Sequence, residues 1–222
     1  GSVIVDNFTA DFSRLYGNEA FNQEINPRWN WVGYPYEYEY FLSDTYDATA
    51  LAEGDMVITK DGDMAIIKDG EWTGDFRVWP NTGMMLYHNG DGVTLPMLAR
   101  GELYQGYWEG NAIPRAKGRD ISVWQYDGSR FPNMMAVVGQ LNIDNADDYT
   151  IGAFVGDECR GAGKIIDGLV LVSLAGEAGE EVTFRIHNEW TGEFFELKNV
   201  LGFTDIAGSL KNPVMLDVPE EV

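Results

Sequence analysis

Cysteine, histidine and basic side chains are scarce in this 222-residue chain. Its single cysteine, Cys159, allows no intrachain disulfide, which excludes the disulfide-rich classes of secreted protein. Its two histidines, His88 and His187, have no partner at metal-ligand spacing, so a zinc site is not expected. Only 15 residues are basic against 36 acidic ones, and the formal net charge is therefore −21.

This charge balance limits the partners that the chain can have. A strongly acidic surface repels phosphate backbones and anionic lipids, so neither nucleic acid nor a membrane surface is an expected partner. It suits cations or neutral ligands such as glycans, although the simplest interpretation is that the charge keeps the protein soluble. No apolar run approaches the length of about 18 residues that a spanning helix needs, so membrane insertion is not expected.

Recognisable catalytic motifs are also missing. There is no G-x-S-x-G motif, and the E-x-D-x-x-E signature of one glycosidase class breaks off after Glu53-Gly54-Asp55. Gly161-Ala162-Gly163-Lys164 resembles a phosphate loop, but Ile165 stands where Ser or Thr is needed. Cys159 lies in a predicted hairpin, where an inert, buried thiol is expected. The sequence favours a protein that is not an enzyme, with a carboxylate-dependent glycoside hydrolase as a less favoured alternative.

The chain is rich in short apolar runs separated by tight turns. Helices are predicted only at 11–24 and 43–51. Six dipeptides that type I′ hairpins favour mark the turns: Asp61-Gly62, Asp69-Gly70, Asn89-Gly90, Asp91-Gly92, Asp127-Gly128 and Asp167-Gly168. Strands are predicted at 56–59, 64–67, 76–79, 84–87, 135–143, 150–155, 164–166, 169–174, 181–187 and 194–197. This pattern predicts an all-β protein with antiparallel hairpins and one or two short helices.

Residues 98–120 have the composition of a connector between two tandem β-sandwich-like modules. Two prolines, four glycines and a basic cluster gather between Leu95 and Asp120. We therefore predict an N-terminal extension at 1–25, a first β module at 26–97 and a second β-sandwich module at 121–222. A seven-residue echo, G-E-W-T-G-D-F at 70–76 and N-E-W-T-G-E-F at 188–194, is either a diverged duplication or two similar turns reached independently.

One stretch in each predicted module is similar to a known pattern. Residues 28–35 (R-W-N-W-V-G-Y-P) resemble the strand pattern G-W-N-W/L-I/V-S-x-P, from which Arg28 and Gly33 depart. In that pattern the strand is followed by W-x-G-x-L and then L-x-P-x-x-G-Y-M, and Trp72–Phe76 and Trp79–Met85 resemble these two stretches in the same order.

The second stretch is Ile151–Gly161, which resembles the pattern V-G-A-F-x-x-x-x-C-R-G of neighbouring β-sandwich modules. Small residues there are expected to allow close strand approach, with Phe154 filling the core. Both patterns are common in secreted and surface proteins of Bacteroidetes-type bacteria, and together they cover roughly 29–87 and 135–216. The resemblance implies a β-rich extracellular module with no catalytic residues to carry over.

The tyrosines of residues 34–40 alternate along one predicted strand and share a face. They are either sheet-packing core or a half-wet platform on which a sugar ring could stack, because tyrosine keeps a polar tip.

The aromatic cluster in a predicted loop is the candidate ligand site. Tyr104, Tyr107 and Trp108 lie between glycines beside Glu109, and glycan sites place rings beside such carboxylates. The alternative is that these rings cover the junction between the two modules.

An acidic turn is the candidate metal site. Asp144, Asp147 and Asp148 crowd hard oxygen ligands into one turn, an arrangement that Ca²⁺ accepts. The alternative is an ordinary solvated turn, because Asp and Asn satisfy their own backbone there. No other cofactor is expected.

Taken together, the sequence predicts a non-catalytic extracellular or cell-surface binding module for glycans or a protein partner. A structural spacer within a larger or anchored surface protein is the main alternative. Gly1-Ser2 is typical of a cloning remnant before a trimmed mature start, so a secretion signal is expected to have been removed.

Overall fold

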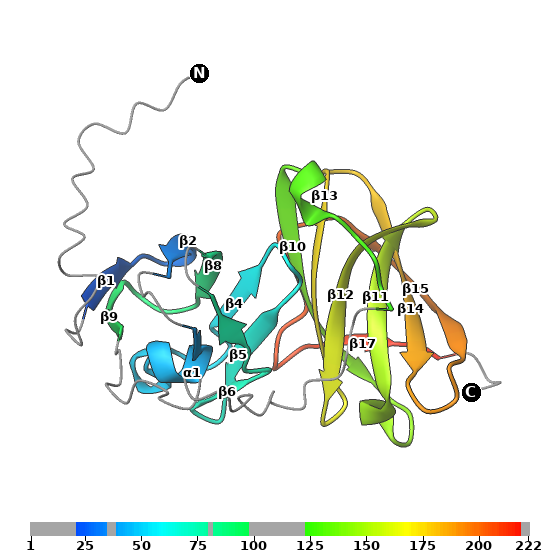
Figure 1. The fold of residues 1–222 in the computed structure, drawn as a ribbon, viewed down its shortest axis with the longest axis horizontal. Helices are drawn as coiled ribbons and strands as arrows, with labels where there is room; N and C mark the ends of the chain where they lie inside the picture. Colours follow the sequence, from blue (N-terminus) through cyan, green and yellow to red (C-terminus); the bar gives the residue numbers. More distant parts are fainter. Residues whose placement is uncertain (1–20, 35–38, 80–81, 98–122, 219–222) are drawn as a thin grey trace, which may run out of the picture.

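The computed structural model describes residues 21–34, 39–79, 82–97 and 123–218. Within these residues the regular structure is mostly strand, with one short α-helix and three short 3-10 helices, so the all-β prediction is confirmed. The strands form two groups that lie side by side, one from residues 21–97 and one from 123–218 (Figure 1).

The first module is built around an antiparallel sheet in the order β2-β8-β4-β5-β6. These strands are β2 (Arg28–Gly33), β4 (Met56–Thr59), β5 (Met64–Lys68), β6 (Glu71–Thr73) and β8 (Gly83–His88). Two small pairs accompany it: β1 (Phe21–Ile25) with β9 (Val93–Met97), and β3 (Tyr40–Phe41) with β7 (Arg77–Val78). Since β1 pairs with β9, this module includes residues that the sequence assigned to the N-terminal extension.

Alternate residues of β4, β5 and β8 face two different cores. Val57, Ala65 and Leu86 point into the first module's own core, which Leu42, Tyr46 and Leu95 help to fill. Their neighbours point to the opposite face, where they pack on the second module: Met56, Ile58, Met64, Ile66, Met85 and Tyr87. Because side chains alternate along a strand, a sheet buried on both faces needs unbroken apolar runs, and these strands have them.

Two tyrosines of the 34–40 row belong to this first core. Tyr34 is buried, and Tyr40 packs against the same cluster. The core interpretation is confirmed for these two, while Tyr36 and Tyr38 lie outside the described residues.

The predicted helices are mostly replaced by other structure. Residues 21–24 belong to β1, so the helix prediction is wrong there, and the rest of 11–24 lies outside the described residues. Residues 43–51 contain only α1 (Leu42–Thr45) and the 3-10 helix η2 (Ala48–Ala50). Asp47 caps η2 by accepting a hydrogen bond from the Thr49 backbone N–H at 2.9 Å.

Two of the six predicted hairpin turns have positive φ at both residues, as type I′ requires. They are Asp69-Gly70, with φ of 55° and 79°, and Asp167-Gly168, with φ of 51° and 74°. The echo also differs in structure: Glu71–Thr73 forms strand β6, whereas Glu189–Thr191 lies in the turn between β14 and β15. The same short sequence thus adopts two different backbone conformations.

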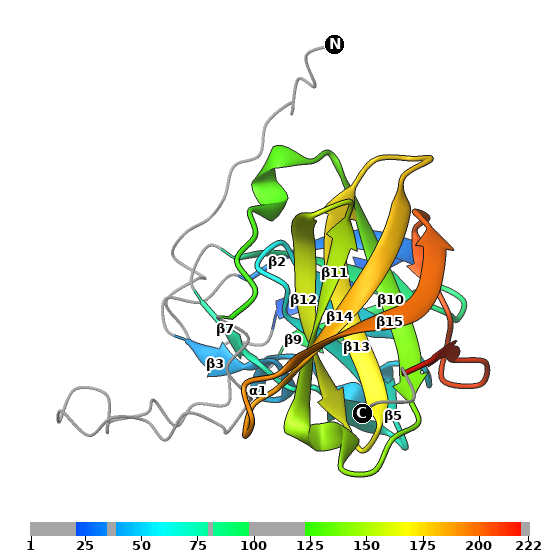
Figure 2. The same ribbon diagram turned by 90° about the vertical axis from the view of Figure 1, so that its right-hand side faces the viewer.

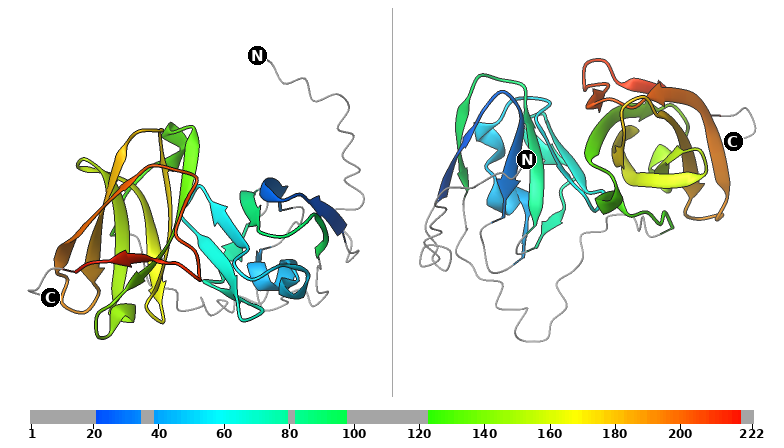
Figure 3. Two further views of the ribbon diagram at one scale, coloured as in Figure 1. Left: turned by 180° about the vertical axis from the view of Figure 1, so that it is seen from behind. Right: turned by 90° about the horizontal axis from the view of Figure 1, so that it is seen from above.

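The second module is one curled sheet in the order β15-β14-β11-β12-β13-β10, with β16 and β17 beside β10. Its bounds are β10 (Asn133–Leu141), β11 (Tyr149–Val155), β12 (Glu158–Ile166), β13 (Leu169–Gly176), β14 (Glu181–Asn188), β15 (Phe194–Gly202), β16 (Ile206–Ala207) and β17 (Val214–Leu216). The 3-10 helices are η3 (Gly128–Arg130) and η4 (Ala146–Asp148). Seen from above, the curl is almost a ring (Figure 3). A single curled sheet thus supplies both walls around the core.

The core of the second module lies inside this curl. It takes alternate residues from each long strand: Met135, Val137, Ile151, Ala153, Val170, Val172, Val182, Phe184, Ile186 and Leu197. Asn199 of β15 joins the two ends of the curl. Its Nδ2 donates to the Met215 carbonyl at 2.9 Å, and its Oδ1 accepts from the Asp217 backbone N–H at 2.6 Å.

The two modules are packed against each other through a buried apolar cluster. Met56, Ile58, Met64 and Ile66 form one buried cluster with Ala136, Val138 and Leu171 from the outside of the curl. The Ser173 hydroxyl donates to the Thr59 carbonyl at 3.4 Å across this interface. In Figure 2 the second module faces the viewer, with the strands of the first module behind it.

Asp63, in the turn between β4 and β5, provides a pH-dependent prediction. Burial raises the pKa of its carboxyl above the usual 3.8, and Lys164 of the second module offsets part of the rise. The folded protein therefore holds this proton more tightly than the unfolded chain does. The stability that this group contributes is fully present below pH 3.8 and is lost as pH rises through the folded value.

We expect Asp63→Asn to remove this dependence. The natural protein should lose free energy of unfolding as pH rises from acid to neutral, because Asp63 becomes charged. The variant should not show this loss. Urea unfolding of both proteins across that range measures the difference, and parallel pH curves would contradict the account.

Candidate functional site

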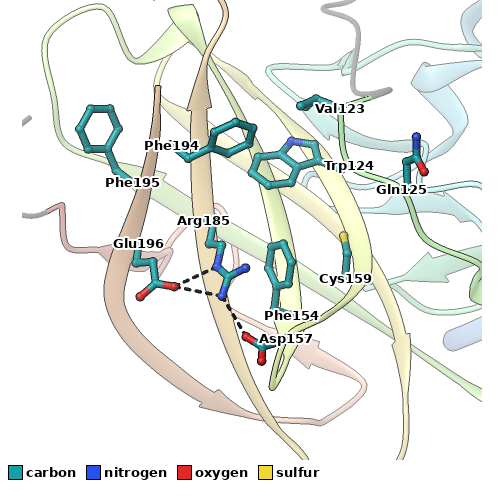
Figure 4. A pocket seen from close by; sticks show the side chains of 10 residues that line it. All are labelled: Val123, Trp124, Gln125, Phe154, Asp157, Cys159, Arg185, Phe194, Phe195 and Glu196. Atoms are coloured by element: carbon teal, nitrogen blue, oxygen red, sulfur yellow. Dashed lines mark hydrogen bonds and ion pairs between the residues drawn. The ribbon is translucent and has the colours of Figure 1, made fainter. Parts of the chain in front are cut away.

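A pocket of about 540 Å³ lies on the outer face of the curled sheet, over β11, β14 and β15 (Figure 4). Its walls are Val123, Trp124, Gln125, Phe154, Asp157, Cys159, Arg185, Phe194, Phe195 and Glu196. This volume falls in the range of about 300–1,000 Å³ that is typical of small-ligand sites.

Trp124 forms one wall of the pocket. It lies in the segment that leads into the second module. Its indole N–H donates to the Thr150 hydroxyl at 3.1 Å, and its ring is only 6% exposed. The indole lies directly over Gly152 of β11, where a Cβ atom would stand 2.6 Å from the ring. Gly152 therefore makes room for an indole rather than for a neighbouring strand.

Phe154 is two residues further along the same outer face. It packs edge-on to Trp124, with ring centroids 5.9 Å apart, and not inside the curl. Phe154 is thus a buried core residue as expected, but it belongs to a small cluster with Trp124 and Ala162 on the outer face and not to the main core inside the curl. Ala153, on the opposite face of β11, occupies that core instead.

Arg185 of β14 lies in the middle of the pocket (Figure 4). Its guanidinium stacks on the Phe154 ring, 4.3 Å from the centroid. Glu196, its cross-strand neighbour on β15, accepts from both Nε and Nη2 at 3.0 Å, while Asp157 lies 3.5 Å from the same Nη2. A planar donor group is thus held between two carboxylates beside an aromatic wall.

Phe194 supplies the pocket's exposed ring. It is 53% exposed, and its centroid lies 5.4 Å from that of Trp124 and 4.6 Å from that of His187. A phenyl ring that is packed along one side and open on the other presents a hydrophobic surface at little entropic cost.

Cys159 lies at the rim of the pocket as a free thiol. Burial raises the pKa of this thiol, although a backbone hydrogen bond at Gly161 and the nearby Arg185 act in the opposite direction. Since the thiolate is the reactive form, a raised pKa disfavours nucleophilic chemistry. The thiol is half-buried and not fully buried as the sequence suggested, and its inertness stays a prediction.

Gly152→Val is expected to displace Trp124 from the sheet and to collapse the pocket. The added side chain overlaps the indole, and overpacking of this kind costs about 1–3 kcal/mol. Urea unfolding measures the loss of stability, and proton exchange of the Trp124 indole reports the broken bond to Thr150. Unchanged indole protection in the variant would contradict this placement of Trp124.

The ligand site expected in the loop cannot be compared with this pocket. Tyr104, Tyr107, Trp108 and Glu109 all lie outside the described residues. That site stays a prediction.

The side chains of the acidic turn have different environments and do not share one partner. Asp147 accepts from the Gly168 backbone N–H at 3.2 Å, Asp148 accepts from the Trp190 indole at 3.1 Å, and Asp144 is exposed. Among the residues that the structure describes, no group of three or more His, Cys, Asp or Glu side chains is arranged to hold a metal ion. Calcium binding at this turn stays a prediction.

Sequence reasoning missed the residues of the outer pocket. The signal available was the alternation along β14 and β15, where Arg185 and Glu196 alternate with core residues. Nothing in the sequence around Trp124 marks it as a wall of the same site, since it precedes the first strand of its module by nine residues.

Within the described residues no helix is long and apolar enough to cross a membrane. The chain was compared with protein families, with curated proteins and with solved structures, and none of the three comparisons finds a match.

Proposed function

We propose that this chain is a non-catalytic, extracellular or cell-surface module that binds a glycan in the outer pocket. The observation that carries the proposal is the half-exposed Phe194 ring standing beside the Arg185 guanidinium and its two carboxylates. The open side of a phenyl ring stacks on the C–H face of a pyranose, while a guanidinium and carboxylates bind its hydroxyl groups.

The arrangement suits a neutral ligand. Arg185 already has Glu196 and Asp157 as partners, so the group as a whole offers donors and acceptors without a positive excess. The chain's net charge of −21 also disfavours a strongly anionic ligand. A neutral sugar needs no excess positive charge in the pocket and is not repelled by the acidic surface.

Among the described residues that line the pocket, no reaction centre is recognisable, which supports a binding role. Both carboxylates of the pocket are ion-pair partners of Arg185, and the thiol at its rim has a raised pKa. A secreted module of this kind would serve as one part of a larger or anchored protein.

A structural spacer is the second candidate, and the interface between the modules favours it. A buried apolar cluster and the bond from Ser173 to Thr59 hold the two modules together as a stiff unit. A stiff pair of modules suits the display of a neighbouring domain at a set distance.

Glycan-array screening followed by calorimetry tests the binding proposal. We expect Phe194→Ala and Arg185→Lys each to weaken binding by about tenfold, equal to about 1.4 kcal/mol. Arg185→Lys keeps the charge but loses the planar fork that Glu196 and Asp157 hold.

Trp31→Ala is the matched control. Trp31 is 69% exposed on the first module, and its loss should leave binding unchanged. Failure to bind any glycan would favour the spacer instead. Equal loss with Trp31→Ala would contradict the assigned pocket.

A further inference from the structure

Trp124 is shared between two cavities. Besides the outer pocket, it lines a second cavity of about 310 Å³. The other walls of that cavity are Lys60, Asp61, Tyr126, Asp127, Gly128 and Ser129. Lys60 and Asp61 belong to the turn between β4 and β5, so the second cavity is built from both modules.

The turn that carries Lys60 is seated firmly on the second module. The Tyr126 hydroxyl donates to the Asp61 carbonyl at 2.5 Å, and Gly62 leaves the space that this hydroxyl fills. Gly128 lies so close to the Lys60 carbonyl that a Cβ atom there would stand 2.8 Å from it. The two cavities on either side of Trp124 therefore keep a fixed relation to each other.

The two cavities differ in chemistry. The outer pocket is walled by rings and Arg185, whereas the second has exposed polar groups, including the Lys60 ammonium and the Asp127 carboxylate. Asp127 receives both of its described hydrogen bonds, from the N–H and hydroxyl of Ser129, on Oδ1. Its Oδ2 keeps its acceptor capacity for a ligand hydroxyl.

We propose that the glycan is an extended chain that spans both modules, with one sugar unit on Phe194 and a following unit in the cavity beside Lys60. This inference rests on the proposed function and names its substrate class: oligosaccharides of two or more units, in preference to single sugars. A ligand held in two adjoining subsites gains affinity from the second subsite, because the translational and rotational entropy of the ligand is lost only once.

A chain-length series tests this inference on the whole protein. The probes are α- and β-linked glucose and mannose oligomers, from a single unit upward, titrated by calorimetry. Affinity should rise by about tenfold when a second or third unit is added, which is about 1.4 kcal/mol. Lys60→Ala should abolish that gain and leave the affinity for the single unit unchanged.

Phe194→Ala serves as the comparison variant, because it should weaken every member of the series alike. Lys60 is an exposed side chain, so Lys60→Ala should unfold at the same temperature as the natural protein. Affinity that is independent of chain length but sensitive to Phe194→Ala would overturn this inference and keep the proposed function. Binding of no oligomer, or binding insensitive to Phe194→Ala, would overturn both.

Discussion

Replacing Asp55 with alanine is expected to lower the free energy of unfolding by about 3 kcal/mol, because removing a buried carboxylate leaves its hydrogen-bond partners unsatisfied. Asp55 is fully buried, and its Oδ2 lies 2.6 Å from Nδ1 of the equally buried His88. The same carboxylate accepts from the backbone N–H of Ala52 at 2.9 Å and of Asn89 at 2.7 Å. Alanine would remove the partner of the buried His88 Nδ1 and the acceptor of two part-buried backbone N–H groups.

The matched control for this prediction is Asp91→Ala. The Asp91 side chain is exposed, and only its backbone carbonyl contacts His88, at 2.6 Å from Nε2. That contact survives the substitution, so a change of under about 0.5 kcal/mol is expected. Urea unfolding, monitored by tryptophan fluorescence, compares the two variants. Equal losses of stability would show that the Asp55 carboxylate does not stabilise the contacts with His88, Ala52 and Asn89.

The second large effect is expected at Gly163 of β12. A Cβ atom there would stand 2.0 Å from the Leu171 carbonyl oxygen and 2.8 Å from the Val172 Cα, both backbone atoms of β13. No rotamer change can relieve a clash with backbone, so Gly163→Ala must push β12 away from β13. We expect a loss of about 3 kcal/mol, at the upper end of the range for overpacking.

Gly202→Ala tests whether this cost comes from the close approach or from losing a strand glycine. Gly202 ends β15 with no atom within 4 Å of its Cβ position. The same substitution there should be neutral or slightly stabilising, because alanine reduces the entropy of the unfolded chain. A similar loss at both positions would contradict the close approach of β12 and β13.

Much of the strand order could be predicted from local chemistry. The apolar run Met56–Thr59 is β4 as predicted, and Asp69-Gly70 and Asp167-Gly168 adopt the turns that their residues favour. The curl of the second module could not be predicted in this way. It depends on contacts far apart in the chain, such as Asn199 with Met215 and Asp217, and on β12 approaching β13 at Gly163.

The candidate site was harder to predict than the fold. Its walls come from the chain entry at Trp124, from β11 and from the β14–β15 hairpin, which meet only after the sheet has formed. Strand alternation places Arg185 on the outer face but does not show that Phe154 and Trp124 lie beside it. Tyr107 and Trp108 stand out in the local sequence, whereas the pocket is formed by residues that only the folded sheet brings together.

The most direct test of glycan recognition by the outer pocket is an NMR titration of the isotope-labelled whole chain with the glucose or mannose oligomer that binds most tightly. The account predicts that the Trp124 indole N–H, the Arg185 Nε–H and the amides of β14 and β15 around Phe194 shift together with increasing ligand. Shifts confined to the first module around Trp31, with these signals unchanged, would contradict it.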